Sequence, residues 1–464
     1  MRLPLGRIAE VTGGAADSAH RDAVVTGYSI DSRTLQPGDL FFAIKGERFD
    51  GHEFVNPALE RGAVAAVVHV GQAARFGDQR RIIAVSNPLD ALQKVGRAVR
   101  RMWNKTVIAV TGSAGKTTTK ESAARLLSAK YRVLKSEGNL NNHYGLPLQL
   151  LRLEPEHELA VLELGMNHAG EISALAAICE PNAGVVTCVA PVHLGFFNSI
   201  ADIARAKYEL IQSLPASGMA VLNADDEYVS QFGRDFPGRV ITFGLGHPAD
   251  VRGEAIHEMG PDGSQFDVVA GGHRAHATLP LIGRHNVYNA LAAIAIAMVG
   301  GLTLEQATSG VALLTPADKR GQVLTVGGAT VINDCYNSNP RALDSVVDAL
   351  AGMAVPDGGR RIVVAGEMLE LGASTDDLHR RSGAHMADRK IDVVLGVRGA
   401  AQKIVDAATE AGMRAEYVET PEEAGEWLWR EARSGDIVLL KASRGVKLEK
   451  ALETWTSQRA ASRN

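Results

Sequence analysis

A short glycine-bearing stretch after an apolar run constrains the fold of this chain more than any other feature. The apolar run covers residues 106–110 and leads into Thr-Gly-Ser-Ala-Gly-Lys-Thr-Thr-Thr at residues 111–119. A strand, a glycine turn and a helix that begins with Lys-Thr form an arrangement in which backbone N–H groups and a helix N-terminus bind phosphate. The common phosphate-binding loop has a glycine five residues before its Gly-Lys pair, where this chain has Val110. The sequence therefore predicts a shorter variant of that loop, at the end of a strand in an α/β sheet.

The residues of this loop have distinct expected roles in nucleotide binding. Lys116 can reach the terminal phosphates, and Thr117 can offer its hydroxyl oxygen to Mg²⁺. The alternative is a glycine turn that threonines cap, with an exposed lysine, but the whole pattern after an apolar strand is much more specific than a lone Gly-Lys pair. The predicted nucleotide-binding residues are Gly112, Ser113, Ala114, Gly115, Lys116, Thr117 and Thr118.

Composition and charge argue against several classes of protein. The 464 residues favour about three domains. A formal net charge of −4 gives no sign of nucleic-acid binding or of a polybasic membrane anchor. Three cysteines without a Cys-x-x-Cys pair argue against a disulfide framework and for a reducing compartment. We see no signal peptide and no apolar run of ~18 residues, so we expect a cytoplasmic, soluble monomer that inserts into no membrane.

Strands and helices alternate along the whole chain, which predicts α/β layers. Apolar runs of strand length at 39–44 and 62–70 belong to a small first unit, and a helix over 86–103 leads out of it. After Thr315 the alternation restarts in a compact doubly wound unit. We therefore expect three domains, namely a small α/β domain at 1–86, a central parallel-sheet domain of the phosphate-loop ATPase type at 87–315, and a Rossmann-like domain at 316–464.

Three further polar residues stand where they could serve chemistry, although each also has a simpler explanation. Glu163 ends an apolar strand, a position where a carboxylate is well placed to hold Mg²⁺. The simpler explanation is an acidic residue that ends a strand by chance. His193 follows the strand expected at 183–190, and a lone histidine there is as often structural. Lys207 lies on an amphipathic helix, where the residue alone favours an ordinary solvated lysine.

Together these segments resemble the ATP-dependent Mur ligases, whose phosphate loop has the same short form and is shared with folylpolyglutamate synthases. The resemblance implies catalytic roles for Lys116, His193 and Lys207, and it implies the Mg²⁺ ligands Thr117, Glu163, His193 and Lys207. It also implies that the lysine of the Ala-Lys-Tyr-Glu segment, Lys207, is carbamylated by CO₂. A carbamate is anionic and can bind a second Mg²⁺, which an ammonium cannot. Its formation needs a deprotonated amine, which burial or nearby cations would favour.

The resemblance assigns further nucleotide contacts around the second domain junction. Asn286 is the best candidate to pair with the adenine edge, whereas His285 and Asn289 are weaker, and Asn289 could as well serve helix packing. Arg320 is the nearest match to an arginine that reaches the ATP phosphates, although the more usual Pro-Gly-Arg is absent. Asp334 matches the aspartate that contacts the ribose.

Two segments are candidates for binding a nucleotide-sugar substrate. The resemblance places Asn139, Asn141 and Asn142 along the cleft, and the alternative is a loop of Asx turns. The first unit resembles the UDP-binding domain of the two family members that act late on the stem peptide, with Ser32 and Arg33 as candidates for the uridine diphosphate end. A folylpolyglutamate synthase would lack this domain.

The last unit carries segments that distinguish members of the family. Tyr336, Asn337 and Asn339 are candidate substrate residues, expected in a turn that faces the cleft, and the same turn could also cap the following helix. Residues 363–372 and 440–449 resemble the member that adds D-alanyl-D-alanine, in which GDM-x-ELG and KGSR are typical. The two departures are a glutamate in place of the aspartate and an alanine in place of the glycine. The DNPR-like motif typical of the member that adds the third stem-peptide residue is absent from the sequence.

The implied activity is the ATP-dependent ligation of D-alanyl-D-alanine to UDP-N-acetylmuramoyl-tripeptide in bacterial peptidoglycan synthesis. It implies ATP, two Mg²⁺ ions and an acyl-phosphate intermediate. We expect the last domain to close over the substrates and exclude water. The alternatives are the sister ligase that adds the third residue, another amide ligase with the same core, such as a polyglutamate or cyanophycin type, and a non-catalytic nucleotide-binding regulator.

Overall fold

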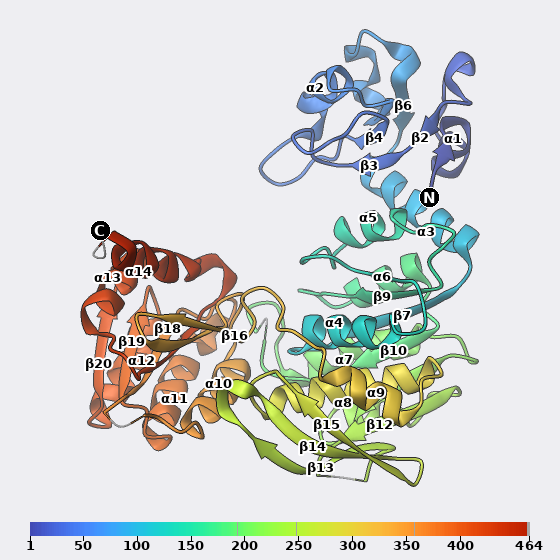
Figure 1. Ribbon diagram of the computed structural model, residues 1–464. Coiled ribbons are helices and arrows are strands. Elements are labelled where there is room, and N and C mark those ends of the chain that lie inside the picture. Colours follow the sequence, from blue (N-terminus) through green and yellow to red (C-terminus); the bar gives the residue numbers. More distant parts are fainter. Residues whose placement is uncertain (193, 247, 357, 462–464) are drawn as a thin grey trace.

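The chain forms three bodies, each built on its own main sheet. The computed structural model describes residues 1–192, 194–246, 248–356 and 358–461. Sheets of four, nine and six strands follow one another along the chain. The first body also contains a separate sheet of two short strands. Figure 1 shows the first body in blue, the central one from cyan to yellow, and the last one from orange to red at the left. The α/β class with a central parallel sheet and a C-terminal sheet unit is confirmed, whereas the boundaries at 86 and 315 stay predictions.

The first body is a small parallel sheet with short helices. Its four strands pair in sequence order and run parallel, and β1 pairs with β2 in an antiparallel manner. The elements are β1 (Leu3–Pro4), α1 (Leu5–Thr12), β2 (Val24–Val25), β3 (Gly27–Ser29), β4 (Asp39–Phe42), α2 (Val55–Glu60), β5 (Ala65–His69) and β6 (Ile82–Val85). The helix that leads out, α3 (Pro88–Trp103), begins at a proline, and the side chain of Asn87 accepts hydrogen bonds from Leu89 N and Asp90 N.

The central sheet has nine strands in the order β15-β14-β13-β12-β11-β10-β7-β9-β8. The strands from β8 to β13 are parallel, and β14 and β15 extend the sheet as an antiparallel meander. The strands are β7 (Thr106–Thr111), β8 (Val133–Lys135), β9 (Leu159–Glu163), β10 (Ala183–Val186), β11 (Met219–Asn223), β12 (Arg239–Gly244), β13 (Val251–Glu258), β14 (Ser264–Ala270) and β15 (His273–Leu279).

Helices cover both faces of the parallel strands. They are α4 (Lys116–Leu127), α5 (Gly145–Leu151), α6 (Glu171–Cys179), α7 (Ile200–Gln212), α8 (Arg284–Val299) and α9 (Leu304–Val311). Val107 and Ala109 of β7 pack in a core with α3, α5, α6 and α7, whereas Ile108 and Val110 pack with α4, α8 and α9. Alternate strand residues face opposite layers, so a strand covered on both sides is apolar throughout.

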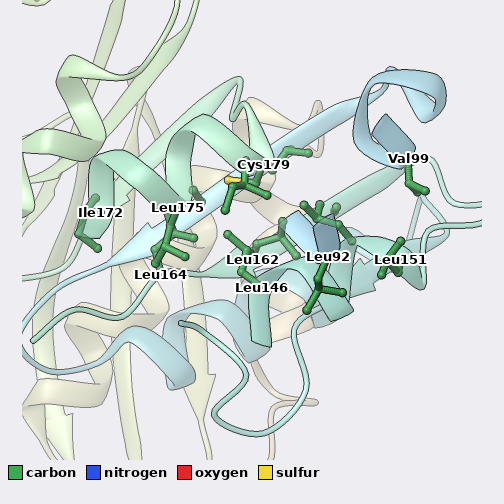
Figure 2. Packing of buried hydrophobic residues seen from close by; sticks show 14 of the residues in the cluster. Leu92, Val99, Leu146, Leu151, Leu162, Leu164, Ile172, Leu175 and Cys179 are labelled. Atoms are coloured by element: carbon green, nitrogen blue, oxygen red, sulfur yellow. The ribbon is translucent and has the colours of Figure 1, made fainter. Parts of the chain in front are cut away.

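The core on the α3 side fixes the end of β9. Figure 2 shows Leu92 of α3, Leu146 of α5 and Leu175 of α6 gathered around Leu162. Leu162 is completely buried. Since the next residue along the strand is Glu163, this packing holds the carboxylate at a fixed position at the carboxyl edge of the sheet.

The phosphate loop lies where the chain changes direction in the central sheet. β7 lies between β9 and β10. The chain passes from β7 through α4 to β8 and β9 on one side, and then crosses to β10 on the other. In open parallel sheets, ligands bind outside the carboxyl ends of the strands at such a point.

The last body is a six-stranded sheet in the order β16-β17-β21-β18-β19-β20, parallel except for the edge strand β16. Two cores lie on its two faces, one with α10 to α12 and one with α13 and α14. The elements are β16 (Gln322–Val326), β17 (Ala329–Asn333), α10 (Pro340–Ala351), β18 (Arg361–Gly366), α11 (Thr375–Asp388), β19 (Val393–Val397), α12 (Ala401–Glu410), β20 (Arg414–Val418), α13 (Pro421–Glu431), β21 (Ile437–Lys441) and α14 (Glu449–Ala461). Within the described ranges, no helix has the length and apolar character needed to cross a membrane.

Candidate active site

A cleft of about 530 Å³ lies between the central body and the last body. The central body lines it with the phosphate loop, the ends of β9 and β10 and the start of α8. The last body lines it with the turn before α10, the loop after β18 and the loop after β21. The predicted site residues in its wall are Ser113, Ala114, Gly115, Lys116, Thr117, Thr118, Asn139, Asn141, Glu163, Asn286, Arg320, Asp334, Tyr336, Asn337 and Asn339.

Both glycines of the phosphate loop are required by close contacts. Gly112 has φ 151°, and a Cβ there would lie 1.8 Å from Thr187 Oγ1. Gly115 has φ 79°, and a Cβ there would lie 2.2 Å from Asn289 Oδ1. The residue in place of the usual upstream glycine, Val110, is still inside β7 and fully buried. The loop is therefore shorter because the strand continues further before the turn begins.

The loop is fixed to the end of β10, which also explains why that strand is shorter than expected. The apolar run 183–190 is a strand only to Val186. Beyond it, Thr187 Oγ1 donates to Ala114 O at 2.5 Å, and Ser113 N donates to Cys188 O at 2.8 Å. Thr187 N still donates to Thr111 O of β7 at 3.1 Å, and beyond it the chain bonds to the loop, so the ladder ends there.

Lys116 lies within the curve of the loop. Its Nζ donates to Gly112 O at 2.8 Å. Burial lowers the pKa of Lys116, the nearby carboxylate of Glu163 opposes this shift, and Arg320 adds to it. The ammonium is thus positioned among the loop's backbone groups, where an anion would also bind.

Two side chains donate to the carboxylate of Glu163, a residue that is 3% exposed. Thr117 Oγ1 donates to its Oε2 at 2.8 Å, and Asn141 Nδ2 donates to its Oε1 at 2.9 Å. Hydroxyl and carboxylate oxygens are ligands that Mg²⁺ accepts, and Mg²⁺ commonly takes its other ligands from water and substrate phosphates. Among the residues that the structure describes, no cluster of three or more histidine, cysteine or acidic side chains could hold a metal alone. The donor set therefore fits Mg²⁺ that is bound together with a nucleotide.

Lys207 lies on α7 and is not part of the cleft lining, and the residue is 2% exposed. Burial lowers its pKa to about 7, with Lys116 as a further cause. No carboxylate of the described residues forms an ion pair with it. The other expected catalytic and metal-binding residue of this region, His193, lies outside the described residues.

Replacing Lys207 by methionine is expected to stabilise the protein near neutral pH in CO₂-free buffer. The pKa of Lys207 falls from 10.5 to about 7 on folding, so the unfolded chain binds more protons between these values and the wild type gains stability as pH rises through this window. Below pH 7 the penalty is constant, and methionine removes it, which should raise the free energy of unfolding by about 2–4 kcal/mol.

Thermal unfolding at pH 6, 8 and 10 measures this effect, with Lys94→Met on the exposed side of α3 as the control. The advantage of the Lys207 variant should shrink toward pH 10. A wild type that is more stable than the variant at pH 6 would contradict the assignment of a buried, destabilised ammonium.

The two asparagines that are candidates for contacting adenine form a hydrogen bond with each other in the structure. Asn286 Nδ2 donates to Ile282 O at 2.8 Å, and Asn289 Nδ2 donates to Asn286 Oδ1 at 3.0 Å. Thr119 Oγ1 of α4 donates to Asn289 Oδ1 at 3.3 Å. These bonds support the helix-packing interpretation of Asn289. His285 also lines the cleft, and burial lowers its pKa to about 4, which keeps the imidazole neutral at pH 7.

The predicted residues of the last body lie together around β17 and its turn. The guanidinium of Arg320 lies 4.1 Å from the ring centre of Tyr336. Lys441 Nζ donates to the carboxylate of Asp334 and to Asn337 O. Asn339 caps α10, because its Oδ1 accepts from the backbone of the first helical turn at 2.9 Å. The turn therefore faces the cleft and caps the helix at once.

Not every predicted substrate residue reaches this cleft. Asn142 lies outside the lining and accepts from Gly145 N at the start of α5. Ser32 and Arg33 belong to the first body and are also outside the lining. Arg33 Nη2 lies 2.7 Å from Asp31 Oδ2, and this pairing lowers the pKa of Asp31 to about 2.

Comparison with known proteins gives one family for all three bodies. Models of the Mur ligase family catalytic domain, the Mur ligase middle domain and the Mur ligase glutamate ligase domain match residues 24–100, 110–297 and 319–444. The UDP-N-acetylmuramoyl-tripeptide–D-alanyl-D-alanine ligase of Bacillus subtilis (strain 168) is 34% identical over 450 residues, which cover 96% of each chain. The chain belongs to the Mur ligase family.

Further relatives and solved structures agree with this assignment. The ligase of the same name from Escherichia coli (strain K12) is 35% identical and aligns with 85% of this chain and 86% of its own. A crystal structure of MurF from Acinetobacter baumannii matches with a TM-score of 0.88 and 29% identity, over 98% of this chain and 99% of that one. MurF ligase from Thermotoga maritima in complex with ADP matches with a TM-score of 0.82 and 28% identity, over 94% and 98%.

Two adjacent aspartates of this Mur ligase were missed in the sequence. They follow β11 in the segment Asn-Ala-Asp-Asp, at the same sheet edge as the phosphate loop. Asp225 accepts from Tyr288 Oη at 2.9 Å. Asp226, 4% exposed, accepts from Val189 N at 3.0 Å and from Arg341 Nη1 at 3.3 Å. Two acidic residues just after an apolar strand could have indicated that they belong to the site, because the carboxyl ends of parallel strands meet at one edge of the sheet.

Arg341 ties the last body of this Mur ligase to the central one. Its Nη1 donates to Val189 O at 2.8 Å as well as to Asp226. A hydrogen bond to a charged group is worth about 1.5–3 kcal/mol, and solvent reduces this to about 1–2 kcal/mol because the Arg341 side chain is half exposed. Arg341→Ala should therefore lower kcat/KM roughly 5–30-fold by loosening the alignment of the two cleft walls. Steady-state phosphate release measures this, with the exposed Arg430→Ala on α13 as the control. Equal kinetics for both variants would show that the contact does not align the cleft.

Proposed function

We propose that this Mur ligase joins D-alanyl-D-alanine to UDP-N-acetylmuramoyl-tripeptide in an ATP-dependent reaction of peptidoglycan synthesis. The observation that carries the proposal is the cleft, in which the phosphate loop faces the loops after β18 and β21. The segments 363–372 and 440–449 cover the ends of these two strands and the loops after them, and their sequences are similar to those of the D-alanyl-D-alanine-adding member. The names of the Bacillus and Escherichia relatives, aligned over most of each chain, support the same activity.

The chemistry must activate a carboxylate, which is a poor electrophile. The carboxylate oxygen attacks the γ-phosphorus of ATP, the bond to the β–γ bridging oxygen breaks, and an acyl phosphate and ADP form. The amine of the dipeptide then attacks the acyl carbon, the carbon–oxygen bond to phosphate breaks, and the nitrogen loses a proton. Negative charges crowd together in the first step, and Lys116 and Arg320 in the cleft wall would offset them.

ATP and Mg²⁺ are the proposed cofactors. The Thermotoga neighbour was solved in complex with ADP, and its fold matches 94% of this chain with a TM-score of 0.82. Thr117 and Glu163 would hold one Mg²⁺ with the phosphates, and His193 and a carbamylated Lys207 would serve a second. Bound Mg²⁺ would screen the charge between the carboxylate and the triphosphate. Burial of Lys207, its lowered pKa and its lack of a carboxylate partner in the described chain support the carbamate.

The three bodies suit a division of labour among the substrates. We assign residues 1–86 to the UDP end with Ser32 and Arg33, residues 87–315 to ATP, and residues 316–464 to the incoming dipeptide. Asn139 and Asn141 in the cleft wall would face the muramoyl peptide, and Asn286 and Asp334 would face the adenosine. The last body is expected to close further when all substrates are bound, and the enzyme is expected to act as a cytoplasmic monomer.

The deciding experiment is ATP-dependent phosphate release with UDP-N-acetylmuramoyl-tripeptide, with and without D-alanyl-D-alanine. Release that requires both, with a product mass increased by one dipeptide unit, would support the proposal. Release with diaminopimelate and the UDP-muramoyl-dipeptide instead would identify the sister ligase. ATP binding without release for any acceptor would favour a regulator.

A further inference from the structure

Lys120 is a wholly buried lysine that the proposed chemistry does not use. It lies in α4, one turn after the phosphate-loop lysine, and its exposed fraction is 0%. A buried ammonium is costly unless it is paired and hydrogen-bonded. The ammonium of Lys120 therefore needs specific partners inside the protein.

The partners of Lys120 lead directly to Glu163. Its Nζ lies 2.8 Å from Glu121 Oε1 and donates to Ser136 O at 2.5 Å. Ser136 is 1% exposed, and its Oγ accepts from Glu163 N at 2.9 Å. Lys120 thus bonds to Ser136, and Ser136 in turn bonds to the backbone of Glu163, the candidate metal ligand.

The same contact also fixes the loop that enters the cleft. Ser136 lies directly after β8, at the start of the segment that contains Asn139 and Asn141. Asn141 Nδ2 donates to Glu163 Oε1, and Thr117 Oγ1, in the first turn of α4, donates to Glu163 Oε2. The helix of the phosphate loop is therefore connected to Glu163 twice, through the side chain and through the main chain.

We propose that Lys120 is a positioning residue that acts through Ser136 and sets the phosphate-loop helix, Glu163 and the 136–142 segment in one fixed arrangement. The inference rests on the proposed function, in which these groups hold the nucleotide, its metal and the muramoyl peptide. Lys120 touches none of the reacting atoms. Its effect is on where Glu163 and Asn141 lie relative to Lys116.

The chain offers a matched control on the same carboxylate. Lys135 contacts Glu121 from the surface, where its side chain is 46% exposed, and makes no bond to Ser136 O. Lys135→Met therefore removes one cation from Glu121 but leaves the connection to Ser136. A difference between the two lysine variants separates that connection from the ion pair alone.

The test compares Lys120→Met, Lys120→Arg and Lys135→Met after circular dichroism shows that each is folded. Lys120→Met should lower kcat about 30-fold or more and raise the Mg²⁺ concentration for half-maximal rate, while KM for the dipeptide changes less than about twofold, because the dipeptide belongs to the last body. Lys120→Arg should recover part of the rate, and Lys135→Met should behave like the wild type. Equal effects of Lys120→Met and Lys135→Met, or no effect of either, would overturn the proposal.

A second readout does not depend on turnover. Hydrogen exchange at the amide of Glu163 should be faster in Lys120→Met, and the affinity for an ATP analogue with Mg²⁺ should fall about tenfold by calorimetry. Ser136→Ala, which removes only the hydroxyl that accepts from Glu163 N, should reproduce both changes if Lys120→Met does not fold. Unchanged exchange and affinity in Ser136→Ala would refute the connection. A wild type inactive on the proposed substrates would refute the function, while these two measurements would still decide the role of Lys120.

Discussion

Glu163→Gln should lower ATP-dependent phosphate release by roughly two to three orders of magnitude at saturating substrates. The carboxylate is buried and accepts from Thr117 Oγ1 on one oxygen and Asn141 Nδ2 on the other. Glutamine keeps the volume, but it removes the charge that would hold Mg²⁺ and turns one acceptor into a donor. The variant should also need much more Mg²⁺ for half-maximal rate, which a titration of Mg²⁺ against the initial rate would measure.

The control for this prediction lies at the other end of the same strand. Glu158 precedes β9, is exposed, and accepts from Arg132 N at 2.9 Å. Glu158→Gln should leave both the rate and the Mg²⁺ dependence unchanged. If Glu163→Gln retained the wild-type rate at every Mg²⁺ concentration, Glu163 would not be a metal ligand, and its role would be limited to orienting Thr117 and Asn141.

The second large effect is expected at Lys207. Lys207→Arg keeps a cation but cannot form the carbamate, so phosphate release should fall about 100-fold or more. With ¹³C-bicarbonate, the wild type should show a carbamate carbonyl resonance that Lys207→Arg lacks and that the exposed-lysine variant Lys94→Arg retains. Absence of the resonance in the wild type, together with full activity in CO₂-depleted buffer, would exclude the modification.

The pH dependence of the carbamate follows from the pKa of Lys207. CO₂ adds only to the neutral amine, and burial lowers the pKa of this amine to about 7. The neutral fraction is therefore large above pH 7 and decreases as pH falls below it. Both the labelled resonance and kcat should decline on the acid side of pH 7. For an unshifted lysine the same decline would begin near the ordinary pKa of 10.5, so the midpoint distinguishes the two cases.

Several expectations from the sequence depended on contacts within a few residues, and these agree with the structure. The strand, loop and helix at 106–127 are present as expected. Two glycines with positive φ and a helix that begins with Lys-Thr are local features of the sequence. The helix from Pro88 and the cap at Asn339 also follow from residues next to them. The antiparallel pairing of β13, β14 and β15 and their place at the edge of the central sheet are not encoded locally.

The sequence did not predict which polar side chains bond to one another in and around the cleft. Asn286 and Asn289 are three residues apart on one helix face, and the amino-acid pattern gives no preference between an adenine contact and the bond that they make to each other. The connection of Arg341 to Val189 spans 152 residues, and the pair Lys441–Asp334 spans 107. The first contact depends on how two sheets meet, and the second depends on the pairing of β17 with β21 in one sheet. Local periodicity describes neither arrangement.

By itself, the sequence determined the phosphate loop, the alternation of strands and helices, the three-body α/β organisation and the family resemblance, because each is a short-range pattern of residue types. Only the tertiary structure decided that Glu163, 46 positions from Thr117, lies 2.8 Å from it, and that the ammonium of Lys120 supports the backbone behind it. The order of strands in the central sheet brings these groups to one edge. That order results from the burial of apolar faces on both sides of the sheet, a property of the whole folded chain and not of any segment.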